Sequence, residues 1–261
     1  IDFMIDHELM DLQNKPGKAS TGYMTSLPSL KAPFVFSCFN HTIFDMQVLT
    51  HELGHAFAGY MAMRSQPISD YYSESTDIAE IHSMSMEQFA YPYAEWFFGD
   101  QADKFRFAHL QEAITFVPFG VAVDEFQHIC YAHPELTPKE RTYQWHLLEE
   151  KYMPWRRYEN DSFMERGGYW YHKLHIYLYP FYYINYTLTT MGAMEFKKKY
   201  AEDKQAAWQD YLKLCKTGGS RSYLETLRYA NLANPFEAGS VERACGYAEK
   251  ILLEQIAKQE Q

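Results

Sequence analysis

The pattern of hydrophobic and polar positions changes near residue 40 of this chain. Before that point the sequence is rich in Gly, Pro, Ser and Thr, and only the run from Ala32 to Phe39 is β-branched and aromatic enough to predict a short strand. After it, apolar residues recur at helical spacing almost to the end. We therefore predict a mainly α protein, a multi-helix domain with a small β-sheet near its N-terminal end.

Prolines and glycine pairs separate the predicted helices. The first should begin at Thr42 or Asp45 and run through Met63, because both residue types cap helices and Pro67 follows. The second should run over about residues 75–89. Further helices are expected over residues 101–115, 119–132, 138–151, 180–200, 203–216, 221–231 and 240–258.

The sequence HELGH at residues 51–55 falls inside the first predicted helix. Residues four apart share a helical face, so the imidazoles of His51 and His55 can point at one metal ion. Glu52 lies beside that ion, where a base for the water that attacks a peptide bond is needed. Five apolar residues are expected to form the stripe that buries this helix: Val48, Leu49, Leu53, Phe57 and Tyr60.

A third ligand should come from the next helix, whose segment DIAEIHSMSME spans residues 77–87. Asp77, Glu80 and Glu87 share one face of it, and Glu80 is central on that face. His82 projects about 200° away from Glu80 and is not expected to join it. We therefore predict Glu80 as the third ligand, with Asp77 and Glu87 orienting the histidines. The alternative is that these carboxylates form a solvated acidic face.

The net charge bears on the possible binding partners, and the cysteine content bears on the cellular compartment. A net charge of −10 repels phosphate backbones and anionic membrane surfaces, so neither nucleic acid nor a membrane is an expected partner. The longest apolar stretch, residues 176–191, is shorter than a membrane span. The 4 cysteines form no CxxC pair and suggest free thiols, and therefore a cytoplasmic protein: Cys38, Cys130, Cys215 and Cys245.

Two segments carry a resemblance to a known family. HELGHAF at residues 51–57, followed by AEIHSMSME at residues 79–87, resembles the thimet oligopeptidase and oligoendopeptidase F family of zinc metallopeptidases. Met84 departs from the pattern of thermolysin-type gluzincins, which have Asp there. Smaller likenesses reach over nearly the whole chain: Gly17-Lys18 with Gly22-Tyr23, the APFVFS run from Ala32, PFYYINY at 180–186 and Asn234-Pro235-Phe236.

The resemblance implies a zincin-like catalytic domain that binds one Zn²⁺ per chain and takes Glu80 as a ligand. Members of this family are about twice as long and have an N-terminal helical half that closes over the zinc cleft. The resemblance and the absence of any compositional break imply that residues 1–261 are a single catalytic domain. This domain would be the C-terminal half of a longer chain.

The resemblance also gives roles to a tyrosine-rich stretch. His175 matches a family His that binds substrate, and Tyr186 best matches the Tyr that stabilises the oxyanion. If residues 180–190 are helical, Tyr179 and Tyr183 share a face with Tyr186 and are implied to contact substrate. Without the resemblance, core packing would be the preferred interpretation of these rings.

Two alternatives use the same residues differently. A non-catalytic peptide-binding module could carry a structural zinc, although such sites usually have four ligands and several cysteines. A di-iron carboxylate bundle would combine two ExxH pairs with a Glu from each of two other helices. Its candidates are Glu52 with His55, Glu125 with His128, and the carboxylates of Glu80 and Glu112.

The favoured hypothesis is a zinc-dependent endopeptidase that hydrolyses internal bonds of short peptides. His51, His55 and Glu80 would bind the metal, Glu52 would act as the base, and His175 and Tyr186 would stabilise the oxyanion. The expected partners are short peptide substrates and the N-terminal half of the same protein. The strand at residues 32–39 could pair with an extended peptide if it lies at an edge of the sheet.

Overall fold

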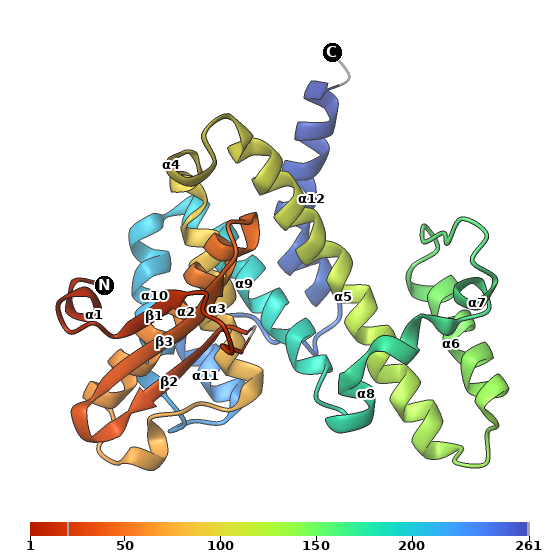
Figure 1. Ribbon diagram of the computed structural model, residues 1–261, viewed down its shortest axis with the longest axis horizontal. Helices are drawn as coiled ribbons and strands as arrows, with labels where there is room; N and C mark the ends of the chain where they lie inside the picture. Colours follow the sequence, from red (N-terminus) through yellow and green to blue (C-terminus); the bar gives the residue numbers. More distant parts are fainter. Residues whose placement is uncertain (20, 260–261) are drawn as a thin grey trace. The chain divides into compact units, whose positions relative to one another are not determined.

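The computed structural model describes residues 1–19 and 21–259, and helices predominate in them, as predicted (Figure 1). Three strands lie near the N-terminal end: β1 Met10–Gln13, β2 Tyr23–Leu27 and β3 Ala32–Phe39. The helices are α1 Asp2–Asp6, α2 Ile43–Ser65, α3 Thr76–Phe89, α4 Ala94–Phe98, α5 Ala102–Ala132, α6 Pro138–Tyr152, α7 Ser162–Glu165, α8 Leu174–Leu178, α9 Ile184–Glu202, α10 Lys204–Thr217, α11 Tyr223–Tyr229 and α12 Ser240–Gln259.

The chain forms two compact units. The first combines residues 1–111 with residues 189–261, and the second consists of residues 112–188. The first contains the sheet and the two predicted metal-binding helices. The second has its own core of large aromatic side chains, among them Phe126, Trp145 and Trp170. The prediction of a single catalytic domain over residues 1–261 stays a prediction.

The sheet has the order β1-β3-β2, with β1 parallel and β2 antiparallel to β3. The predicted strand over residues 32–39 is confirmed, but its expected place at an edge is wrong. Val35 is 0% exposed and Ala32 is buried, so β3 is the buried central strand, and the free edges belong to β1 and β2. Both edge strands are short and lie among loop-forming residues, which hid them in the sequence pattern.

Helix α2 packs against β2 and β3 and also against α3 and α10. The predicted apolar stripe does not bury it, because Val48, Leu49, Leu53, Phe57 and Tyr60 are only half-buried. A helix enclosed by several elements needs small residues where their backbones approach closely. The fully buried apolar positions of α2 are mainly small residues: Gly54, Ala56, Ala58, Gly59 and Ala62.

Two predicted helix boundaries are wrong. Residues 101–115 and 119–132 belong to one continuous helix, α5, which contains Pro118. A single proline removes one backbone hydrogen bond, a loss that a long packed helix can tolerate. Helix α9 begins at Ile184, not at residue 180, because Phe181 adopts a positive φ of 59° just after Pro180. Within the described residues, no helix combines the length and the hydrophobicity that crossing a membrane requires.

Candidate metal centre

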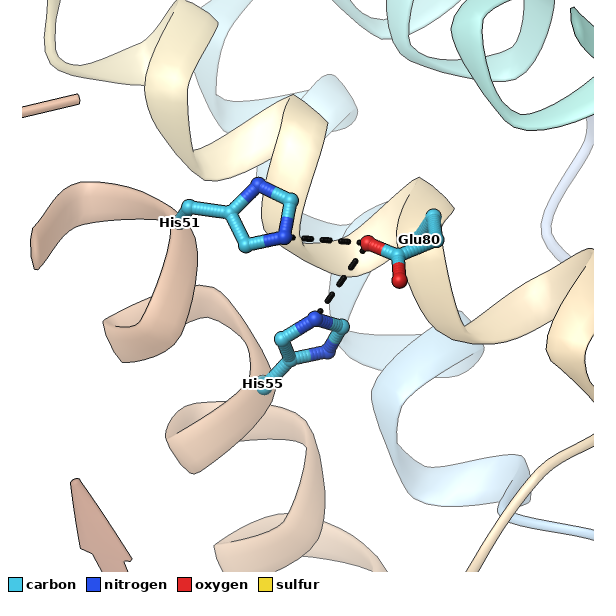
Figure 2. Close-up of side chains that lie close together, drawn as sticks. All are labelled: His51, His55 and Glu80. Atoms are coloured by element: carbon cyan, nitrogen blue, oxygen red, sulfur yellow. Dashed lines mark ion pairs between the residues drawn. The ribbon is translucent and has the colours of Figure 1, made fainter. Parts of the chain in front are cut away.

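Helices α2 and α3 bring the three predicted ligands together (Figure 2). His51 Nε2 lies 3.0 Å from Glu80 Oε2, and His55 Nε2 lies 3.3 Å from the same oxygen. Both imidazoles project from successive turns of α2 toward the carboxylate that α3 presents. Within the described part of the chain, this is the cluster of His, Cys, Asp and Glu side chains that could hold a metal ion.

Close approach of the two helices depends on Gly54, which lies between the ligand histidines. A Cβ at this position would meet Ser83 Cα at 2.6 Å and the His82 carbonyl oxygen at 2.8 Å. Both distances are shorter than van der Waals contact, so a larger residue would push α3 away from α2. Ser83 has a further role, because its hydroxyl donates a hydrogen bond of 2.9 Å to Glu80 Oε2.

Two of the three distances between these donor atoms fit a zinc ion. Zinc–nitrogen and zinc–oxygen bonds of about 2.0 Å at tetrahedral angles place neighbouring ligand atoms about 3.3 Å apart. The distances of 3.0 and 3.3 Å from the imidazoles to Glu80 Oε2 are close to this value. Two imidazoles and one carboxylate are also the donor set of several catalytic zinc sites, which keep the fourth position open.

The imidazole of His51 lies between two carboxylates. Its Nδ1 is 2.6 Å from Glu87 Oε1, and its Nε2 faces Glu80. Burial acts to lower the pKa of His51, but hydrogen bonds to Glu80 and Glu87 outweigh it and raise this pKa to about 10. A neutral imidazole has a single N–H, so it can satisfy both carboxylates only by gaining a proton or by binding a cation at Nε2.

Glu52 lies beside the ligands rather than among them. It is 6% exposed, and its Oε2 has no hydrogen-bond partner. Burial raises the pKa of Glu52, although both histidines and the Met24 backbone N–H act to lower it. Glu52 faces a cavity of about 280 Å³ that is lined by Gly22, Phe44, Gln47, Val48, His51, Glu52 and Glu87. A buried carboxylate that retains one unpaired oxygen is suited to accept a proton.

The two predicted orienting carboxylates have different surroundings. Glu87 contacts His51, as predicted. Among the described contacts, Asp77 has no hydrogen bond to either imidazole, and its Oδ1 is buried without a hydrogen-bond partner. It acts instead on Tyr223, whose pKa is raised first by burial and then by the charge of Asp77. His82 is 1% exposed and points to Glu74 at 3.1 Å, away from the ligands, as predicted.

Two residues that the sequence patterns did not indicate, His109 and Tyr91, extend the hydrogen bonding of Glu87. His109 Nε2 lies 2.6 Å from Glu87 Oε2, and the Tyr91 hydroxyl lies 2.7 Å from His109 Nδ1. His109 comes from α5 and Tyr91 from the turn after α3. Neither belongs to a motif with fixed spacing, so only the fold brings them to the metal ligands.

His175 and the three predicted tyrosines cluster within the second unit. The centroid of the His175 ring lies 5.1 Å from that of Tyr183, 5.9 Å from that of Tyr186 and 6.1 Å from that of Tyr179. Their expected arrangement on one helical face is wrong, since Tyr179 and Tyr183 precede α9. The turn around Pro180 gathers these rings instead.

The second ExxH pair is held elsewhere in the second unit. Glu125 accepts hydrogen bonds of 2.9 Å from Lys151 and a further one from the Tyr152 hydroxyl. The His128 side chain is 68% exposed and lies beside Asp124. These surroundings are typical of surface polar contacts, and they favour a mononuclear metal centre over the di-iron alternative.

Three relatives illustrate the likeness of this chain to known proteins. A solved structure of PZ peptidase A with an inhibitor is 48% identical, has a TM-score of 0.87, and is matched over 97% of this chain and 45% of that one. The oligoendopeptidase F homolog of Borreliella burgdorferi is 26% identical over 86% of this chain and 38% of the relative. Oligopeptidase PepF of Bacillus subtilis is 22% identical over 96% of this chain and 37% of the relative.

The chain therefore spans less than half the length of these relatives. The sequence profile of peptidase family M3 matches residues 3–246. This match covers almost the whole chain, including both helices of the metal centre, and the resemblance to the oligoendopeptidase F family is thereby confirmed. The chain belongs to peptidase family M3.

Proposed function

We propose that this chain provides the zinc-binding catalytic half of an endopeptidase that hydrolyses internal bonds of short peptides. The observation that supports this most is the convergence of His51, His55 and Glu80 beside a buried carboxylate that borders a cavity. The names of the relatives support peptide hydrolysis, and PZ peptidase A was solved with an inhibitor. A structural zinc would need neither the base nor the open position.

His51, His55 and Glu80 would hold one Zn²⁺, which would act as a Lewis acid on the scissile carbonyl and lower the pKa of water. Glu52 would accept the proton of the attacking water through its unpaired oxygen and pass it to the leaving amine. Its burial supports this role, because desolvation raises its pKa toward the working range of a general base.

His175 and Tyr186 are proposed to donate hydrogen bonds to the oxyanion, with Tyr179 and Tyr183 contacting the substrate. The support for these roles is the family membership and the clustering of the four side chains around His175. The remaining length of the relatives supports a longer protein whose N-terminal half completes the substrate cleft. Four free thiols support a reducing compartment such as the cytoplasm.

A quenched-fluorescence peptide assay of the longest available form of the protein would test this proposal. Turnover should require Zn²⁺ and stop when a chelator removes it. The E52Q substitution should reduce kcat by about 10²- to 10⁴-fold, because the general base is lost. Zinc content should stay at one ion per chain, because Glu52 is not a ligand.

Three results would contradict the proposal. Turnover at the parent rate in the E52Q variant would remove Glu52 as the base. Peptide binding without any turnover, in the zinc-loaded parent, would favour the non-catalytic module. Two iron atoms per chain, in place of one zinc, would favour the di-iron alternative.

A further inference from the structure

Three buried side chains and half-buried His51, all of the first unit, form one continuous chain of hydrogen bonds that starts at a candidate metal ligand. His51 Nδ1 meets Glu87 Oε1 at 2.6 Å, and Glu87 Oε2 meets His109 Nε2 at 2.6 Å. The other nitrogen of His109 meets the Tyr91 hydroxyl at 2.7 Å. Glu87, His109 and Tyr91 are each 8% exposed, so water can scarcely replace any of these partners.

The carboxylate of Glu87 fixes the direction of two of these hydrogen bonds. An ionised carboxylate can only accept, so Glu87 receives an N–H from His51 and another from His109. The other ring nitrogen of His109, Nδ1, pairs with the Tyr91 hydroxyl, which can donate or accept.

Tyr91 is itself held at three points. Its backbone carbonyl accepts hydrogen bonds from Arg106 at 2.8 and 3.1 Å, and Lys197 Nζ lies 3.6 Å above its ring. Its hydroxyl is therefore presented to His109 in a defined position. His55 differs, because among the described residues Glu80 is the carboxylate that it contacts.

We infer that Tyr91 and His109 are positioning residues for the metal centre. They hold the Glu87 carboxylate so that His51 keeps its proton on Nδ1 and turns the lone pair of Nε2 toward the ion. This inference rests on the proposed zinc site and extends it to two residues that do not touch the metal. Partners of metal-bound histidines commonly alter metal affinity by 10- to 100-fold when they are replaced.

Zinc affinity, measured against a competing chelator at fixed pH, tests this inference on three variants. H109L should weaken binding by about 10- to 100-fold, because Glu87 loses a donor. H109Q should recover most of the loss, since its amide can donate to Glu87 as Nε2 of His109 does. Y91F keeps the ring below Lys197 and removes a single oxygen atom, so it should weaken binding by about 2- to 10-fold.

A spectroscopic measurement and a control variant distinguish an effect on the orientation of His51 from a general loss of protein stability. The visible absorption of the Co²⁺-substituted protein should change in H109L and return toward the parent spectrum in H109Q, because reorientation of His51 alters the ligand field. The D210N variant is the matched control. Buried Asp210 pairs with Lys199, Lys213 and Asn231 and has no described contact with the candidate ligands, so its loss should lower Tm and leave zinc affinity unchanged.

The outcomes distinguish this inference from the proposed function. If the parent chain binds no zinc, the proposed function fails. If the parent binds zinc and H109L and Y91F bind it equally tightly, with unchanged Co²⁺ spectra, only the inference is overturned. Equal loss of affinity in D210N would also overturn it, because the effect would then follow stability.

Discussion

At the scale of single residues, the two candidate ligand histidines differ in the number of carboxylates that contact their rings. His51 has a carboxylate beside each ring nitrogen, whereas in the described part of the chain the carboxylate contact of His55 is with the Glu80 oxygen. Glu80 in turn receives the hydroxyl of Ser83 on its ligand oxygen. The side chains around the proposed zinc therefore restrict the orientation of two of the three ligands, which lowers the entropy that binding would cost.

The proposed oxyanion donor can be tested one hydroxyl at a time. Y186F should lower kcat by about 10²- to 10³-fold with little change in KM, because a hydrogen bond that forms only in the transition state is lost. Steady-state kinetics of Y186F, Y183F and Y179F would be compared with those of the parent. A normal kcat in Y186F, together with a reduced kcat in one of the other two, would move the role to that tyrosine.

Half-buried Lys197 should give the protein a distinctive dependence of stability on pH. Burial, and then the charge of Arg106, lowers its pKa from 10.5 to about 7. Between these two values the unfolded chain holds a proton that the folded chain lacks, so the free energy of unfolding should rise with pH. The whole rise is at most about 5 kcal/mol.

The K197M variant should lack this rise and be more stable than the parent at pH 7 and below. The difference should shrink as the pH approaches 10.5, where both states of the parent lose the proton. Denaturant unfolding of both proteins across this range would measure it. Parallel stability curves for parent and variant would show that Lys197 keeps an ordinary pKa.

At the scale of elements, the metal centre depends on how closely α2 and α3 approach. G54A would place a methyl group 2.6 Å from Ser83 Cα, so one helix must shift. We expect a loss of about 1–3 kcal/mol in the free energy of unfolding, together with weaker zinc binding. Denaturant unfolding and chelator competition would measure the two effects.

Gly246 provides the matched control, because it lies within α12 and a Cβ there would meet no atom within 4 Å. G246A should leave zinc affinity unchanged and stabilise the helix by up to about 1 kcal/mol. Unchanged zinc affinity in G54A would mean that the helix contact does not limit the ligand geometry.

At the scale of the whole molecule, the proposed metal ligands belong to one of two compact units. The three ligands and the hydrogen-bonded chain from Glu87 to Tyr91 lie entirely within residues 1–111. The proposed oxyanion donors, His175 and Tyr186, belong to residues 112–188. The candidate metal ligands and the proposed oxyanion donors therefore belong to different units.

Zinc should therefore stabilise the two units unequally. At a free zinc concentration 1,000 times its dissociation constant, the free energy of unfolding should rise by about 4 kcal/mol for a unit that unfolds with loss of the metal. Hydrogen exchange should show this protection in α2 and α3, with much less change in α6 to α8. Equal protection of both units would mean that they unfold together, and no protection in α2 or α3 would argue against the zinc site.

The sequence by itself determined the helical class, the strand over residues 32–39, and three candidate metal ligands with a carboxylate beside them. Those features follow from periodicity and from residues close together in the chain, which a helix places on one face whatever surrounds it. Glu87 could be proposed for the same reason, because it lies two turns from Glu80 along α3.

Tertiary structure alone decided which strand is central, which residues bury α2, and that His109 and Tyr91 extend the support of His51. These features depend on contacts between segments far apart in the chain, and no local spacing encodes them. It also separated Asp77 from the ligands and gathered Tyr179 and Tyr183 by a turn instead of a helix. Local sequence spacing predicts which side chains share a helical face, whereas tertiary packing determines which residues that face contacts.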